Sequence, residues 1–283
     1  MSYVSPSFLA LVLALPAGCG DDGGSAGAPA PTDREVFLVQ RAAAAAGAVN
    51  WTTEAASDSI VLRVPGSSVP GPMGVPTHPG ATPAFDYGAD VDFVIDFDAL
   101  DPDGNDLFPD ATGQVHVTAA GTDSDTPNAG VATFSAAVTA DTDVVFTDPQ
   151  SGAQTTIPAG ASWAYLLEVT WSRSDDNNWT VTATALTTVN FTDLVVDDGA
   201  TTLTVDVQGE REVTSTRTRV GGKLTHERSF EGSLVITTDD GTTVETVTLE
   251  YLNPGRVRIA VLGNVFGPMT EGRIRALFRA FIP

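Results

Sequence analysis

From Tyr87 to the end of the chain, apolar and polar residues alternate over long stretches. In the first stretch the apolar residues are Val91, Phe93, Ile95 and Phe97, and aspartates stand between them. A longer run, Ser162 to Ser172, has this apolar set: Trp163, Tyr165, Leu167, Val169 and Trp171. Trp179 to Val189 repeats the pattern. Because successive side chains of a strand point to opposite faces, the pattern predicts strands with one buried and one solvated face.

Further strands are predicted over 113–119, 130–147, 201–208, 211–220, 223–237, 243–252 and 256–263. Dipeptides typical of hairpin turns separate several of them: Asp198-Gly199, Gly221-Gly222, Asp240-Gly241 and Pro254-Gly255. Hairpins in succession favour an antiparallel meander, folded as a sandwich or as a curled, partly open barrel. We therefore expect a mainly β fold and one domain over 33–283, with a membrane β-barrel as the alternative.

Two helices are expected, one at each end of this domain. Thr32 and Glu35 fit a capping box, which predicts a short helix from Asp33 to Ala46 that ends at Gly47. A strand at 59–64 and a Pro/Gly-rich loop at 65–83 follow it. At the other end, Glu271 to Ile282 has apolar residues at helical spacing with arginines opposite. Such a helix either covers one end or face of the sheet, which we favour, or lies on a membrane surface.

The charge of the chain limits its partners. The net charge is −22 and the sequence pI is about 4.1, so we expect no nucleic-acid partner. Residues 1–172 contain 3 basic and 21 acidic residues, whereas residues 173–283 contain 11 basic and 15 acidic residues. The second part is therefore nearly balanced. Two faces or two subdomains would explain this difference, although an acidic solubilising surface is the simpler interpretation.

The N-terminus has the features of an export signal. Phe8 to Leu15 is an apolar run that is too short to span a bilayer, and Pro16-Ala17-Gly18-Cys19 follows it. The stretch resembles the lipobox of bacterial lipoprotein precursors, through Leu15, Ala17, Gly18 and Cys19, the chain's single cysteine. The alternative is an ordinary secretory signal with an incidental cysteine, since Pro16 stands where the pattern prefers an aliphatic residue.

The resemblance implies a signal peptide over 1–18, an acyl anchor such as palmitate on Cys19, and a lipid bilayer as partner. Residues 19–32 are then the anchor site and a tether, because Gly20 to Pro31 contains almost nothing to bury. The glycine after the cysteine implies delivery to the outer membrane or cell surface of the cell envelope, with the periplasmic face as an alternative.

One acidic loop has the composition of a calcium site. Its oxygen-bearing residues are Asp101, Asp103, Asn105 and Asp106, with Gly104 between them, and aspartates of the preceding strand lead into it. Calcium takes carboxylate and amide oxygens from loops of this kind. The spacing is not that of an EF-hand, and the same residue types form ordinary turns. Calcium is the one cofactor that the sequence raises, and a plain acidic turn is the favoured interpretation.

Motifs for catalysis are weak. The three histidines, His78, His116 and His226, are scattered, and Gly160-Ala161-Ser162-Trp163-Ala164 misses the final glycine of a nucleophile elbow. Phe230 stands where a zinc-protease motif beginning at His226 needs its second histidine. Core packing explains the tryptophans better than a sugar-stacking platform does.

We therefore expect a non-enzymatic binding or structural domain with an unidentified protein or glycan partner. The alternatives are a glycan hydrolase that uses unidentified carboxylates, and a carrier that shelters an apolar ligand under the C-terminal helix.

Overall fold

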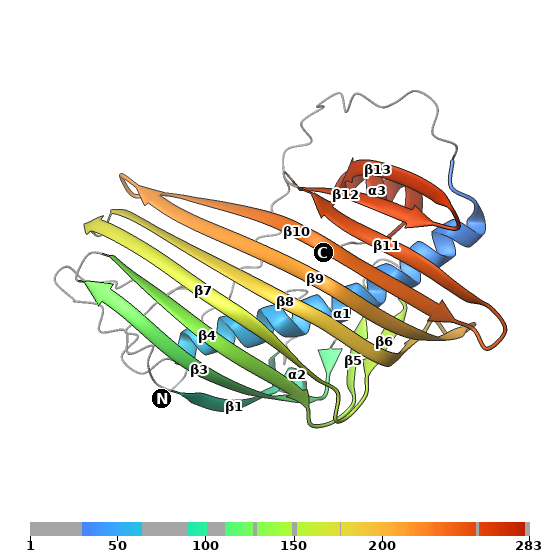
Figure 1. The fold of residues 1–283 in the computed structure, drawn as a ribbon, viewed down its shortest axis with the longest axis horizontal. Coiled ribbons are helices and arrows are strands. Elements are labelled where there is room, and N and C mark those ends of the chain that lie inside the picture. Colours follow the sequence, from blue (N-terminus) through green and yellow to red (C-terminus); the bar gives the residue numbers. More distant parts are fainter. Residues whose placement is uncertain are drawn as a thin grey trace.

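The computed structural model describes residues 30–63, 90–100, 111–126, 129–148, 152–175, 177–252 and 255–280. They form one antiparallel sheet of 13 strands, with the order β1-β3-β4-β7-β8-β9-β10-β11-β12-β13. β2, β5 and β6 form a side ladder that joins β8. The sheet is curled and does not close, since β1 lies at one end of this path and β13 at the other (Figure 1). The expected mainly β fold is confirmed, in its curled and open form.

The first six strands are β1 (Val91–Asp96), β2 (Ala111–Thr112), β3 (Gln114–Thr126), β4 (Ala129–Ala140), β5 (Val144–Thr147) and β6 (Gln154–Ile157). The long central strands are β7 (Ser162–Asp175), β8 (Asn178–Asp197), β9 (Thr202–Val220) and β10 (Lys223–Asp239). The last three are β11 (Val244–Leu252), β12 (Arg256–Val261) and β13 (Asn264–Thr270). The helices are α1 (Asp33–Arg63), α2 (Phe97–Leu100) and α3 (Glu271–Phe278).

Burial follows the alternation read from the sequence. In β7 the five apolar residues of the predicted face include Trp163, Tyr165, Leu167 and Val169, all at most 6% exposed, and Trp171, which is half-buried. Phe93, Ile95 and Phe97 are buried in the same way. The prediction of one buried and one solvated face is therefore confirmed for these strands.

The expected N-terminal helix is confirmed from Asp33, but its expected end at Gly47 is wrong, because α1 has 31 residues and continues to Arg63. The strand expected at 59–64 is wrong over 59–63, which belongs to α1. Gly47 does not end the helix, and the ring of Trp51 packs 3.6 Å from the point where a Gly47 Cβ would lie. Thr52 and Thr53 donate to backbone carbonyls one turn earlier, so their hydroxyls are satisfied inside the helix. Tertiary packing thus overrides the weak preference of glycine and β-branched residues against helix.

α1 is the centre of the hydrophobic core. It runs behind the sheet along much of its length (Figure 1), and at 1.5 Å per residue it is about 46 Å long. Its fully buried residues include Leu38, Ala42, Ala45, Ala56 and Ile60. Small alanine side chains let the helix backbone approach the sheet closely, and the apolar side chains of the strands fill the space around it.

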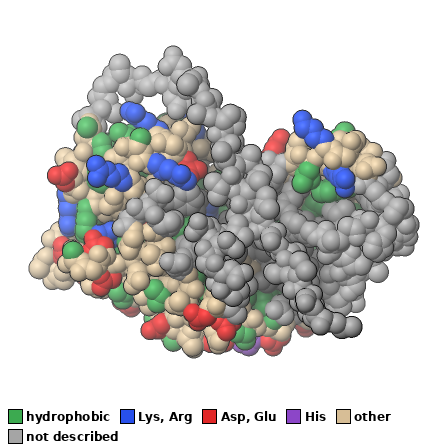
Figure 2. Space-filling view, turned by 180° about the vertical axis from the view of Figure 1, so that it is seen from behind, with side chains coloured by type: hydrophobic (Ala, Val, Ile, Leu, Met, Phe, Trp, Pro, Cys, Tyr) green, Lys and Arg blue, Asp and Glu red, His purple; other side chains and the backbone are tan. Residues whose placement is uncertain are grey.

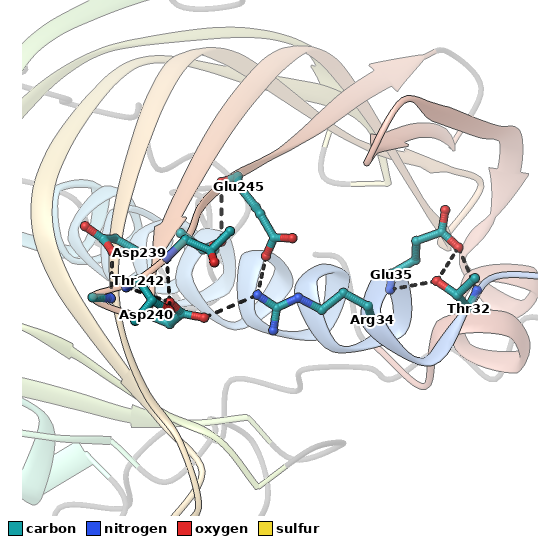
Figure 3. A network of polar contacts seen from close by, with 10 residues as sticks. Thr32, Arg34, Glu35, Asp239, Asp240, Thr242 and Glu245 are labelled. Atoms are coloured by element: carbon teal, nitrogen blue, oxygen red, sulfur yellow. Dashed lines mark hydrogen bonds and ion pairs between the residues drawn. The ribbon is translucent and has the colours of Figure 1, made fainter.

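The predicted capping box at the start of α1 is confirmed. The Thr32 backbone N–H donates to Glu35 Oε2 at 2.6 Å, and the Glu35 N–H donates to Thr32 Oγ1 at 3.3 Å. The hydrogen bond from Thr32 lowers the pKa of the Glu35 carboxyl, and Asn264 Nδ2 donates to its other oxygen. In the same turn of the helix, Arg34 pairs with Asp240 of the β10–β11 turn and with Glu245 of β11 (Figure 3). The first turn of α1 is therefore tied to the last third of the chain.

Two glycines account for the curl of the long strands. The sequence predicted separate strands at 201–208 and 211–220, but β9 continues through Gly209, whose φ is +142°. A Cβ on Gly209 would lie 2.0 Å from the Ser233 carbonyl oxygen, and one on Gly232 would lie 2.2 Å from that of Glu210. The backbones of β9 and β10 approach here as only glycine permits, which lets the strands bend without breaking the ladder.

Other boundaries differ from expectation in detail. The predicted strand 130–147 is two strands, β4 and β5, and the structure adds β6 and β13, which were not predicted. Gly199, Gly221, Gly222, Gly241 and Gly255 have the positive φ values of the predicted hairpin turns. The Pro/Gly-rich loop at 65–83 lies outside the described residues.

The favoured role of the C-terminal helix is confirmed. Ile274 and Phe278 of α3 are fully buried, and the Phe278 ring meets that of Phe266 edge-on at 5.2 Å. Gln40 of α1 donates to the Phe278 carbonyl at 3.1 Å. α3 thus covers the end of α1 and β13, while Arg273, Arg275 and Arg279 are exposed.

Candidate functional site

The inner face of the sheet is not covered equally along the strands. α1 crosses behind the sheet, while the tips of the β7–β8 and β9–β10 hairpins project past it at the upper left of Figure 1. The described apolar side chains on the inner side of these distal parts include Trp171, Trp179, Val181, Ala183, Ala185, Val213 and Phe230, and all except Val181 are only half-buried. This apolar surface, which we call the distal inner face, is our candidate site.

At the edge of this surface next to α1 lies a buried arginine. Arg211 is 2% exposed, and its guanidinium lies 4.8 Å from the centre of the Phe230 ring and 4.6 Å from that of Tyr251. The ladder places Arg211 opposite Gly232 and Gly232 opposite Tyr251. Because Gly232 has no side chain, the guanidinium and the Tyr251 ring meet over it, in a cation–π arrangement that is stronger when water is excluded.

α1 also reaches this arginine cluster. Burial raises the pKa of the Tyr251 hydroxyl above its ordinary value of 10, against the opposing effects of the Arg211 charge and of the nearby Asn50 side chain of α1. Tyr251 therefore stays protonated at neutral pH. The cluster forms the boundary between the helix-filled core and the distal inner face.

Farther out, Trp179 carries an unused donor. Its indole N–H is buried but meets no hydrogen-bond acceptor among the described residues. The ladder pairs Trp179 with Arg219, and Arg219 with Leu224, which is 58% exposed. A buried donor without an acceptor costs about 1–3 kcal/mol. This position thus favours an acceptor oxygen beside Trp179.

The two faces of these strands differ in charge. The described charged side chains of the distal inner face are Arg211 and Arg219, and none of its described side chains is acidic. The outer face of the same strands carries the acids: Glu168, Glu210, Glu212, Glu227 and Glu231. From the back, basic and hydrophobic side chains lie next to each other at the hairpin tips, at the upper right of Figure 2. Among the residues at the β9–β10 turn, Lys223, Leu224 and Val220 are exposed.

The rest of the outer face is rich in threonine. Three cross-strand pairs, Thr180/Thr218, Thr182/Thr216 and Thr184/Thr214, have Oγ1 atoms 3.1–3.3 Å apart. Such pairs contribute about 0.2–1 kcal/mol each and fix the register of β8 and β9. The ladder thus has a polar outer side, which leaves the apolar surface on the inner side.

A shallow depression of about 650 Å³ also lies on the sheet, lined by Glu210, Glu231, Ser233, Glu250 and Leu252 with parts of Gly232 and Tyr251. Glu250 accepts from Arg258 at 2.5 Å, and Glu210 and Glu231 are exposed. These carboxylates are in the ordinary setting of surface acids, which water solvates.

The residues singled out from the sequence are placed as follows. Cys19 and the loop residues Asp101, Asp103, Asn105 and Asp106 lie outside the described residues. Where the structure is described, no three His, Cys, Asp or Glu side chains gather as a metal site. Of the aspartates before the loop, Asp92 contacts His116, and Asp96 accepts from Gln114 at 3.0 Å.

His78 lies outside the described residues, and the other two histidines lie on separate strands. His116 lies on β3, and His226 lies on β10 opposite Arg217 in the ladder. Ser162 begins β7 and is exposed. Trp163 is 6% exposed and donates to Thr53 at 3.1 Å, which confirms core packing, and Trp171 packs over Gly130.

The pair of His116 and Asp92 gives a testable titration. His116 Nε2 lies 2.5 Å from Asp92 Oδ1, and this hydrogen bond raises the pKa of the imidazole above 6.5. We expect the NMR titration of His116 to lie above that of a model peptide, and Asp92→Asn to lower it. Because the folded-state pKa is the higher one, this pair stabilises the fold at low pH, and the effect is lost as the pH rises through that value. An unchanged titration in Asp92→Asn would contradict the pairing.

Sequence reasoning did not identify the distal inner face. Its arginines stand at the alternating positions where neighbouring strands have apolar residues, as Arg211 and Arg219 do in β9. Arginines at positions where a strand would otherwise have apolar residues were the feature of the sequence that could have indicated this site. Comparisons of the chain with protein-family models, curated proteins and solved structures gave no match. The chain is therefore described by its fold alone: an open antiparallel sheet whose concave side is filled by the N-terminal helix α1.

Proposed function

We propose that this chain is an exported lipoprotein, held at a cell-envelope membrane by an acyl anchor on Cys19, whose β domain is a non-enzymatic binding module. The observation that supports the anchor is the capped start of α1 at Thr32, because the first described helix begins where the expected tether ends. The twelve residues from Gly20 to Pro31 reach at most about 40 Å when fully extended. The domain would then stay close to the membrane on the outer-membrane or cell-surface side.

The distal inner face supports a binding module over a hydrolase. A glycosidase needs two carboxylates that face each other across the scissile bond, and the described side chains of this face include none. The three glutamates of the outer depression lie in an open surface, whereas a catalytic acid is usually tuned by an enclosed site.

The packing of the helices disfavours the alternative of a carrier that encloses its ligand. α3 packs onto α1 and β13, and α1 fills the concave side of the sheet that an enclosed ligand would need. Among the described helices, none is long and apolar enough to cross a membrane.

The anchor is tested by Cys19→Ser. We expect the parent protein to enter the detergent phase of a Triton X-114 separation and to incorporate labelled palmitate, and Cys19→Ser to lose both properties. Acyl chains contribute about 0.8 kcal/mol for each buried methylene, so the shift should be nearly complete. Ser25→Ala, a change inside the tether, serves as the matched control. Unchanged partitioning of Cys19→Ser would refute the anchor.

A further inference from the structure

We propose that the distal inner face binds an amphiphile that has an anionic headgroup, a phosphate ester with one long alkyl chain being the simplest example. The inference deepens the proposed function: it rests on the β domain being a binding module and not on the anchor. It is carried by three features of the described residues, namely an apolar surface beyond α1, arginine as its charged component, and an unused indole donor.

The apolar surface fits the alkyl chain. Val169 and Val181 are buried at its base, and Trp171, Ala183 and Ala185 are half-buried around them. The small Ala183 and Ala185 share one face of β8, and their ladder partners on β7 are Val169 and Leu167. This arrangement gives a shallow apolar strip on which a chain can lie, and burial contributes about 25 cal/mol for each Å² removed from water.

The charges of the face select the headgroup. In a chain of net charge −22, an arginine-bearing face without a described acid repels cationic headgroups and attracts anionic ones. Arg211 already lies between Phe230 and Tyr251, so we assign the headgroup to the outer part of the face, beside Arg219.

The hydrogen-bond donors set its position. The Trp179 N–H lacks an acceptor among the described residues, and Arg219 is its partner in the ladder. A phosphate oxygen at the rim would accept from Arg219, and one that enters beside the Trp179 ring would accept from the buried indole N–H. Hydrogen bonds to charged groups are about twice as strong as neutral ones. At this end the face opens to solvent beside Leu224, so the headgroup stays at the rim while the alkyl chain extends toward Phe230.

The test uses the full chain with Cys19→Ser, which removes the proposed acyl anchor so that no detergent is needed. Dodecyl phosphate, dodecyl maltoside and dodecyltrimethylammonium, each below its micelle concentration, are titrated by calorimetry, with inorganic phosphate as the chain-free probe. We expect dodecyl phosphate to bind most tightly, the maltoside at least tenfold more weakly, and the cationic amphiphile and inorganic phosphate not measurably.

Two substitutions separate the donors from the surface. Trp179→Phe keeps a ring but removes the N–H, and Arg219→Gln removes the charge. Each should weaken dodecyl phosphate about tenfold and leave dodecyl maltoside unchanged. Arg258→Gln, which removes an arginine of β12 that pairs with Glu250 of β11, is the matched control and should change neither. Circular dichroism of each variant checks that it is folded.

Three outcomes would overturn the inference. Equal binding of phosphate and maltoside would mean that the face does not select charge. Unchanged binding in both variants would place the amphiphile elsewhere. A concentration-dependent dimer in sedimentation, without amphiphile binding, would mean that a second copy covers the face. None of these results would alter the partitioning of the lipidated protein, so failure of the inference and failure of the anchor are distinguishable.

Discussion

Gly232→Ala is expected to lower the free energy of unfolding by about 3 kcal/mol, because the new methyl group meets backbone and not a movable side chain. The Cβ would lie 2.2 Å from the Glu210 carbonyl oxygen, and the φ of Gly232 is +121°. Relief requires β9 and β10 to separate at the point where the sheet bends. The change would also press on the space in which Arg211 and Tyr251 meet.

Urea denaturation followed by circular dichroism measures this effect, and Gly241→Ala is the matched control. Gly241 also has a positive φ, +81°, but no atom lies within 4 Å of its added Cβ. Gly241→Ala should therefore lower the free energy of unfolding only by the cost of the left-handed conformation, about 1 kcal/mol. Equal losses in the two variants would show that the close approach of β9 and β10 does not constrain the fold.

Asp198→Asn is expected to cost about 2–3 kcal/mol, because it leaves a buried arginine without its counter-charge. Arg41 of α1 has a side chain 4% exposed, pairs with Asp198 in the β8–β9 turn, and lies 4.7 Å from the centre of the Phe37 ring. Asparagine retains a side-chain oxygen that can accept hydrogen bonds from the Ala200 and Thr201 N–H groups, as Asp198 does, so the turn itself should survive.

The same substitution has a pH signature. Hydrogen bonds from Ala200 and Thr201, and then the Arg41 charge, lower the pKa of Asp198 below its ordinary value of 3.8. A group whose pKa is lower when folded stabilises the protein above the unfolded-state pKa, and this is lost as the pH falls through the folded value. Denaturation midpoints measured from pH 6 down to pH 2 should therefore fall less steeply in Asp198→Asn.

Glu271→Gln is the control for Asp198→Asn. Its partner Arg275 is one helical turn away, and both side chains are more than 40% exposed. The exposed pair should be worth at most about 0.5 kcal/mol. A loss as large as that of Asp198→Asn would contradict the role given to burial.

Alternation in the sequence was enough to predict the sheet because its physical cause is local. Side chains of β7 alternate in burial as their hydrophobicity alternates, and turn glycines such as Gly241 lie where hairpins need positive φ. The capping box of Thr32 and Glu35 is local as well. These features were predicted correctly from neighbouring residues.

The length of α1 was not predictable in this way. The alanine run fits a helix, but Gly47 and the β-branched residues after it disfavour one locally. They are helical because the curled sheet surrounds them, and the sheet is built from residues far along the chain. The candidate site was missed for the same reason: Arg211, Phe230 and Tyr251 come from three strands, and only the register brings them over Gly232.

The central position of α1 also determines when the protein can finish folding. α1 belongs to the start of the chain, yet its partners include Glu245 and the Phe278 carbonyl, more than 200 residues later. During synthesis, its apolar surface emerges before any strand is present to cover it. Contacts of such long sequence separation form slowly, so this alanine-rich helix must stay shielded from aggregation until the last hairpins arrive.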